Sequence, residues 1–73
     1  MSRFEVISEV TGTVWKVEAQ VGQAVGDDDV ILIVESMKME IPITSMDSGT
    51  VVEVLVSQGD VVSEGQHVAT IER

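Results

Sequence analysis

The sequence predicts an all-β domain, a small sandwich or flattened barrel made of two similar halves. The chain has 15 Val and 6 Ile against 2 Leu and 3 Ala, and β-branched side chains favour strands over helices. Apolar and polar residues alternate in short stretches that are separated by Gly and Asp, as in half-buried strands joined by turns. An internal repeat, offset by 37 residues, predicts a pseudo-twofold axis.

The repeat aligns two segments without a gap. TGTVWKVEAQVGQAVGDDDVILIVE, which starts at Thr11, lies over SGTVVEVLVSQGDVVSEGQHVATIE, which starts at Ser48. This register pairs Trp15 with Val52, Ala19 with Val56 and Val34 with Ile71, so the inward positions of one half are expected to match the inward positions of the other. Identical residues are found at Gly12, Thr13, Val14, Val17, Gly22, Val25 and Glu35 and at Gly49, Thr50, Val51, Val54, Gly59, Val62 and Glu72.

Length and composition exclude several classes of protein. A chain of 73 residues supports one domain, here residues 1–73. It has no cysteine for disulfides and only one histidine, which argues against a zinc cluster, so the apolar core must hold the fold. The amino terminus lacks a signal-peptide pattern and no segment has the roughly 20 apolar residues of a membrane span, so a cytoplasmic protein is expected. A net charge of −9 argues against nucleic acid and anionic membranes as partners.

The first half contains a strand around residues 4–7, then an alternating stretch. Within residues 14–21 the inward positions are expected to be Trp15, Val17, Ala19 and Val21. This parity predicts that Trp15 is an anchor in the core or at the barrel end rather than a platform for a ligand.

A turn and an apolar run complete the first half. Asp28 aligns with Gly65, a residue free to take positive φ, so an altered or looser turn is expected around residues 27–29. Residues 30–34 are all apolar, and the repeat predicts that Ile31 and Ile33 point outward. We expect neighbouring strands or the amino-terminal strand to cover them, in preference to their forming an exposed docking patch.

The segment SMKMEIPITSMD joins the two halves and contains one of only two lysines. A two-residue turn at Met37 and Lys38 would pair Ser36 with Met39 and residue 35 with residue 40. Lys38 would then lie at the tip of a β-hairpin, at the centre of the repeat.

Three features of this hairpin conflict with what folding alone selects. Met-Lys is a poor sequence for a turn that needs positive φ. Glu35 faces Glu40 across the strands, which is mildly destabilising. Met37 and Met39 are apolar and would be exposed. Such local conflicts are expected at functional sites. The alternative is a wider turn whose methionines tuck into the barrel end while Lys38 neutralises its acidic neighbours.

An exposed lysine amine is accessible to the active site of another enzyme and is a nucleophile once deprotonated. The modifying enzyme would have to provide that deprotonation. His67 is expected to be structural, because no motif places a nucleophile or a paired acid beside it.

The segment ESMKMEIP resembles the attachment motif of biotin carboxyl carrier domains, in the biotinyl/lipoyl attachment family. Pro42 and the segment SGTVVEVLVSQGDVVSEGQ share the resemblance, which covers nearly the whole chain and implies turns at Gly49, Gly59, Asp60 and Gly65. It implies a flattened barrel of two four-stranded antiparallel sheets. It also implies that a biotin protein ligase joins biotin to Lys38, that Met37 and Met39 serve recognition, and that Glu35, Ser36 and Glu40 flank the recognised turn.

The resemblance further implies a non-catalytic carrier whose biotin moves a carboxyl group from a biotin carboxylase to a carboxyltransferase. The chain is expected to be a free-standing carrier and a monomer. The acceptor stays open among acyl-CoA, pyruvate and urea. Two alternatives also stay open. Lipoyl domains share the barrel and modify a hairpin lysine, although they typically have Asp-Lys-Ala there, and dual modification is conceivable. The second alternative is an unmodified interaction module of a carboxylase complex.

Overall fold

Two four-stranded antiparallel sheets pack face to face in the computed structural model, which describes residues 2–73. One sheet has the order β1-β8-β6-β3, formed by Arg3–Ile7, His67–Glu72, Gly49–Val54 and Ala24–Val25. The other has the order β5-β4-β2-β7, formed by Met39–Thr44, Val30–Ser36, Gly12–Val17 and Val61–Val62. This architecture confirms the predicted fold class. Residues 2–73 contain no helix, and hence none that could cross a membrane.

The core lies between the sheets and draws equivalent side chains from both halves. Its fully buried members are mostly β-branched, as the composition predicts. Phe4, Val10, Val17 and Val54 are partly buried and pack against it. The buried apolar side chains are Val6, Val14, Ala19, Val25, Ile31, Leu32, Val34, Ile43, Val51, Val56, Val62, Val68, Ala69 and Ile71.

The pseudo-twofold repeat covers more of the chain than the sequence alignment showed. Ser8 and Ser45 also differ by 37 residues, and both are fully buried. The Ser8 hydroxyl donates to the carbonyl of Val10, and the Ser45 hydroxyl donates to the carbonyl of Asp47. Strand β5 is therefore the counterpart of β1, so the segment after the hairpin is the first strand of the second half rather than a linker.

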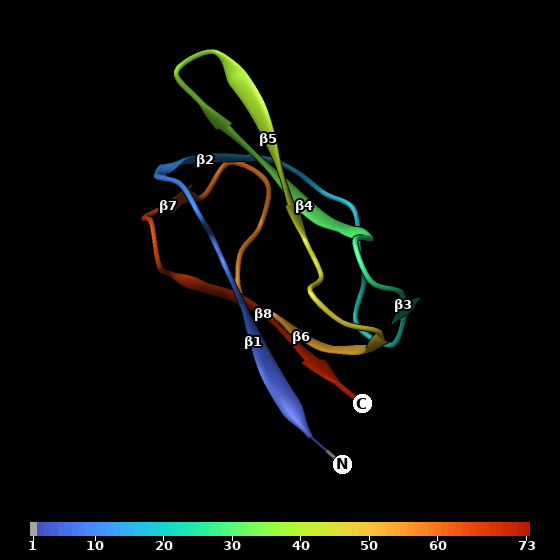
Figure 1. Cartoon of the computed structure of the whole chain (residues 1–73). Coiled ribbons are helices and arrows are strands. Elements are labelled where there is room, and N and C mark those ends of the chain that lie inside the picture. Colours follow the sequence, from blue (N-terminus) through green and yellow to red (C-terminus); the bar gives the residue numbers. More distant parts are fainter. Residues whose placement is uncertain (1) are drawn as a thin grey trace.

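The molecule is elongated and measures 37 × 17 × 17 Å, and its two ends carry equivalent strand pairs. The β4–β5 pair is the counterpart of the β8–β1 pair, but only β4 and β5 are joined by a turn. Figure 1 shows that hairpin at one end of the molecule and both chain ends at the other. The Arg73 amide donates to the Ser2 carbonyl at 2.9 Å and ties the two ends together.

The predicted direction of Trp15 is wrong. Its side chain is 44% exposed, whereas Val14 is buried. The register of β2 against β4 shifts between Val14 and Lys16, which leaves Trp15 as the extra residue of a β-bulge. Ala19 is buried as predicted, but Val21 is 64% exposed. The bulge switches the inward parity of the strand, which a strict two-residue alternation cannot anticipate.

The predicted direction of Ile31 is wrong for the same reason. Ile31 is fully buried in the core, and the register of β4 against β5 shifts between Val30 and Leu32. Ile33, which pairs with Pro42, lies on the outer face and is partly buried, as expected. Strand β4 thus turns two consecutive side chains inward at its start and alternates afterwards.

The turn at Asp28 is neither altered nor looser, contrary to the expectation. Asp28 has φ 70°, close to the 87° of Gly65, so it takes the left-handed conformation that Asp tolerates better than most residues. The Asp28 amide donates to the Ser45 carbonyl at 2.9 Å, as the Gly65 amide donates to the Ser8 carbonyl at 2.7 Å. The same turn is therefore built twice.

Candidate functional site

The β4–β5 hairpin has the predicted register. Glu35 pairs with Glu40 and Ser36 pairs with Met39, which leaves Met37 and Lys38 as a two-residue turn. Both turn residues have positive φ, 52° for Met37 and 68° for Lys38, as a type I′ turn requires. These conformations are unfavourable for residues with a β-carbon. This turn conformation suits the twist of β4 and β5, but it places local backbone strain at Met37 and Lys38.

The side chains at the tip are turned to solvent. Met37 is 93% exposed and Met39 is 65% exposed, so the alternative in which the methionines tuck into the barrel end is wrong. Lys38 is exposed as well. Within residues 2–73 it forms no ion pair and no side-chain hydrogen bond, so it does not neutralise its acidic neighbours. The lysine amine is open to an approaching enzyme.

The base of the hairpin carries the other predicted residues. Glu35 and Glu40 are exposed and face each other across β4 and β5, while Ser36 is partly buried. Neither glutamate forms an ion pair within the described part of the chain. Like charges in directly opposite positions are destabilising. The structure thus brings all six predicted residues together at one end of the molecule.

Gly12 is a residue whose contribution the sequence analysis missed. A β-carbon there would overlap the Glu35 carbonyl oxygen and lie 2.8 Å from Cγ1 of Val34. Strand β2 can therefore approach the base of the hairpin only because this residue is glycine. Gly49, expected in a turn, instead begins β6, and a β-carbon there would lie 2.6 Å from the Glu72 carbonyl oxygen. The identity of the two glycines in the repeat was the available signal.

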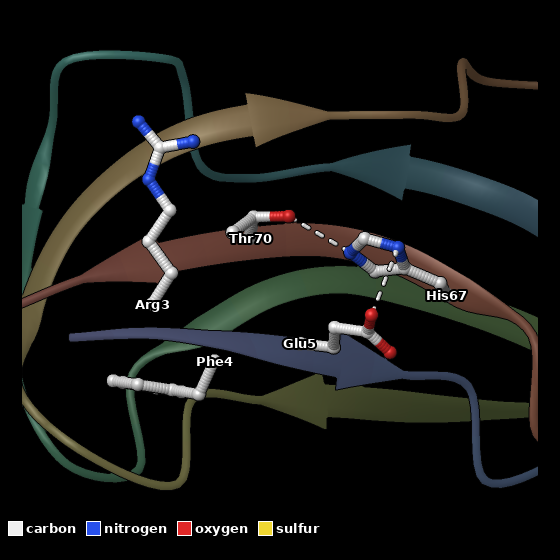
Figure 2. Close-up of a pocket in the computed structure, with 5 residues that line it drawn as sticks. All are labelled: Arg3, Phe4, Glu5, His67 and Thr70. Atoms are coloured by element: carbon white, nitrogen blue, oxygen red, sulfur yellow. Dashed lines mark hydrogen bonds and ion pairs between the residues drawn. The ribbon is translucent and has the colours of Figure 1, made fainter.

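His67 lies on the other sheet, at the start of β8. Figure 2 shows it in a shallow hollow on the outer face of β1 and β8, with its ring between Glu5 and Thr70. One ring nitrogen lies 2.8 Å from the Thr70 hydroxyl and the other lies 3.9 Å from the Glu5 carboxylate. Arg3 also lines this hollow. The pKa of Arg3 is raised above its ordinary value, mainly because Arg3 donates a hydrogen bond to Glu72.

Fold and site together define a class of protein: a small two-sheet β domain that displays one unpaired lysine on a strained hairpin. The family model described as "Biotin-requiring enzyme", the biotin/lipoyl family, matches residues 5–71. The chain belongs to this family.

Relatives of similar length agree with the assignment. The chain is 40% identical over 67 residues to the biotinylated protein TB7.3 homolog of Mycobacterium leprae, a match that covers 92% of this chain and 94% of that protein. It is 44% identical over 57 residues to the biotin/lipoyl attachment protein of Bacillus subtilis, with 78% of each chain covered.

Solved structures share the fold. The urea carboxylase of Kluyveromyces lactis matches with a TM-score of 0.93 and 38% identity, over 99% of this chain and 6% of that much longer one. The lipoyl domain of the 2-oxoglutarate dehydrogenase complex from Azotobacter vinelandii matches with a TM-score of 0.72 and 25% identity, over 88% of this chain and 81% of that domain.

Proposed function

We propose that the protein is a biotin carrier, that residues 1–73 form a single biotinyl domain, and that a biotin protein ligase attaches the biotin to Lys38. The observation that carries the proposal is the hairpin tip, where an unpaired lysine stands between two exposed methionines. The chemistry that bound biotin would supply is the transport of a carboxyl group from a biotin carboxylase to a carboxyltransferase. The family match and the biotinylated relative support this function.

The residues of the chain fit this group through access and positioning rather than through a pocket. Backbone pairing as far as Ser36 and Met39 holds the two-residue turn at a fixed place on a rigid sheet. The Lys38 amine has no internal partner to give up when an amide bond forms, and a linear side chain can then enter the active sites of larger enzymes. Met37 and Met39 offer flexible apolar contacts that suit more than one partner. In this proposal the chain itself is non-catalytic, monomeric and cytoplasmic.

The test is co-expression with a biotin protein ligase followed by intact-mass measurement. We expect the mass to increase by one biotinyl group in the wild type and in the Lys16→Arg variant, but not in Lys38→Arg. Lys16 is the matched control because it is also exposed and lies on β2 of the same sheet. Wild-type protein without biotin, or biotin retained on Lys38→Arg, would contradict the proposal.

Lipoylation at Lys38 is the second candidate, favoured by the likeness to a solved lipoyl domain. The methionines that flank Lys38 favour biotin. A competition assay with a lipoate ligase and a biotin ligase separates the two, because a faster reaction with lipoate would reverse the ranking. An unmodified interaction module is the third candidate, and a negative streptavidin blot of native protein that co-purifies with a tight partner would support it.

A further inference from the structure

The one tryptophan of the chain lies outside the core. Trp15 is 44% exposed on the outer side of β2, because the β-bulge turns it away from the buried Val14. Tryptophan side chains are highly buried on average in folded proteins. The exposure removes the reason to expect a core anchor at this position. It leaves a large apolar side chain available for contact on the sheet that also carries the hairpin.

Two further apolar residues lie in line with Trp15 across the sheet. The residue after Trp15 pairs with Ile33 of β4, and Ile33 pairs with Pro42 of β5. Ile33 lies on the outer face and is partly buried, and Pro42 is exposed. We call Trp15, Ile33 and Pro42 the apolar row. It crosses the adjacent strands β2, β4 and β5, two of which lead directly to Lys38.

The fold does not require apolar residues at these positions. The offset of 37 residues relates Ile33 to Thr70 and Pro42 to Glu5. On that equivalent face the Thr70 hydroxyl contacts the ring of His67, which lies beside Glu5 (Figure 2). One architecture thus accepts polar groups where the apolar row has Ile33 and Pro42. Neighbouring apolar side chains that are exposed without being needed for folding indicate a binding surface.

The apolar row lies within reach of a group attached to Lys38. Ile33 is three residues before Ser36, the last paired residue of β4, so with the turn included the row lies about 13 Å from the tip. A biotinyl group on the Lys38 amine would hang on about ten bonds of about 1.5 Å, or about 12 Å when extended. Its fused rings lengthen this reach further. The rings therefore meet the apolar row when the arm folds back along the outer face.

We propose, on the basis of the proposed function, that the apolar row is a resting site for the biotinyl group on Lys38. Trp15 contributes an indole ring, which makes favourable contacts with a thioether sulfur such as the one in the biotin rings. Ile33 and Pro42 contribute aliphatic contacts beside it. The row is a surface rather than a pocket, so the group is held weakly and is free to leave for the active site of a larger enzyme.

Charge and tethering select this occupant. Amide formation removes the carboxylate of biotin, so the attached group is uncharged and is not repelled by Glu35 and Glu40, which lie between the row and the tip. A second copy of the chain would instead bring another net charge of −9 to the same face. A tethered group has an effective concentration of about millimolar, so it occupies a weak site that a dilute free ligand leaves empty.

The test uses intrinsic fluorescence, which reports Trp15 alone because the chain has one tryptophan. Unmodified wild-type protein is compared with protein that a biotin protein ligase has biotinylated, as verified by intact mass. Biotinylation is expected to lower the acrylamide quenching constant about twofold and to shift the emission to shorter wavelength, because a group docked for half of the time or more shields the exposed indole. This protection should persist over about hundredfold dilution, since the site is intramolecular.

Ile33→Thr, which copies Thr70, should lose most of the protection once it is biotinylated. Leu55→Thr is the matched control, because Leu55 is 45% exposed but lies outside the apolar row, and its protection should equal that of the wild type. The rate of capture by streptavidin is a second measurement. Biotinylated Trp15→Val, which copies Val52, should be captured about twofold faster than the wild type, because no docked state competes with capture.

Each other outcome overturns a stated part of the proposal. An equal quenching constant with and without biotin on Lys38 would overturn the resting site and leave Lys38 as the acceptor. Protection that Ile33→Thr keeps, or that Leu55→Thr loses equally, would show that the apolar row is not the contact. Protection that disappears on dilution would assign the row to the biotin of a second copy. If intact mass shows no biotin on the wild-type chain, the proposed function fails and the resting site fails with it.

Discussion

Replacing Lys38 by glycine is expected to stabilise the fold although it removes the proposed acceptor. Lys38 has φ 68°, a conformation that costs a residue with a β-carbon about 1–2 kcal/mol. Glycine relieves that cost but loses about 0.5–1 kcal/mol more backbone entropy on folding. No hydrogen bond or ion pair of Lys38 within residues 2–73 is lost. The net gain is about 1 kcal/mol, or about 4–8 °C in Tm for a domain of this size.

Thermal unfolding followed by circular dichroism measures the effect, and Lys38→Ala is the control. Alanine removes the amine but keeps the β-carbon, so its Tm should stay near that of the wild type. Asp28→Gly should raise Tm in the same way, because Asp28 has φ 70°. The reasoning about backbone strain is refuted if Lys38→Gly is no more stable than Lys38→Ala.

Two further changes test the packing. Gly12→Ala should destabilise the fold by about 1–3 kcal/mol in chemical denaturation, because its β-carbon would overlap the Glu35 carbonyl oxygen. Gly26→Ala, whose nearest contact would be an ordinary 3.7 Å, should change stability little, and equal losses would contradict the packing argument. Leu32→Ala should cost about 2–5 kcal/mol because Leu32 is fully buried, whereas Leu55→Ala, at a side chain that is 45% exposed, should cost clearly less by the same measurement.

The sequence was sufficient to predict the hairpin and its register. Once Met37 and Lys38 were taken as the turn, the pairing of Glu35 with Glu40 followed from counting, and the structure has that pairing. The prediction succeeded because a two-residue turn leaves no freedom in register. The exposure of Met37 followed from the same geometry. The role of Lys38 as an acceptor stays a prediction.

The directions of Trp15 and Ile31 could not be predicted from alternation, because each lies at a β-bulge. A bulge adds one residue to a strand and reverses the parity after it. The same bulge recurs in the second half, where the register shifts between Val51 and Glu53. The available signal was the repeated order of two apolar residues, a charged residue and valine, seen in VWKV and VVEV. Strict alternation does not produce that order.

The complete extent of the repeat was missed because the first strand of each half has little identity in sequence. Residues 4–8 read FEVIS and residues 41–45 read IPITS, and only the serine at the end is shared in register. That serine is kept in both halves because it is fully buried and its hydroxyl satisfies a nearby carbonyl. The outer residues of these strands are free to differ, and they do.

The joining of Ser2 to Arg73 at the end of the molecule opposite the hairpin has a practical consequence. An affinity tag, a fluorophore or a surface linker added to either terminus would point away from Lys38. Immobilised through such a linker, the protein would present the lysine to the solution in a uniform orientation. Binding kinetics measured on a sensor surface would then report the hairpin face rather than a mixture of orientations.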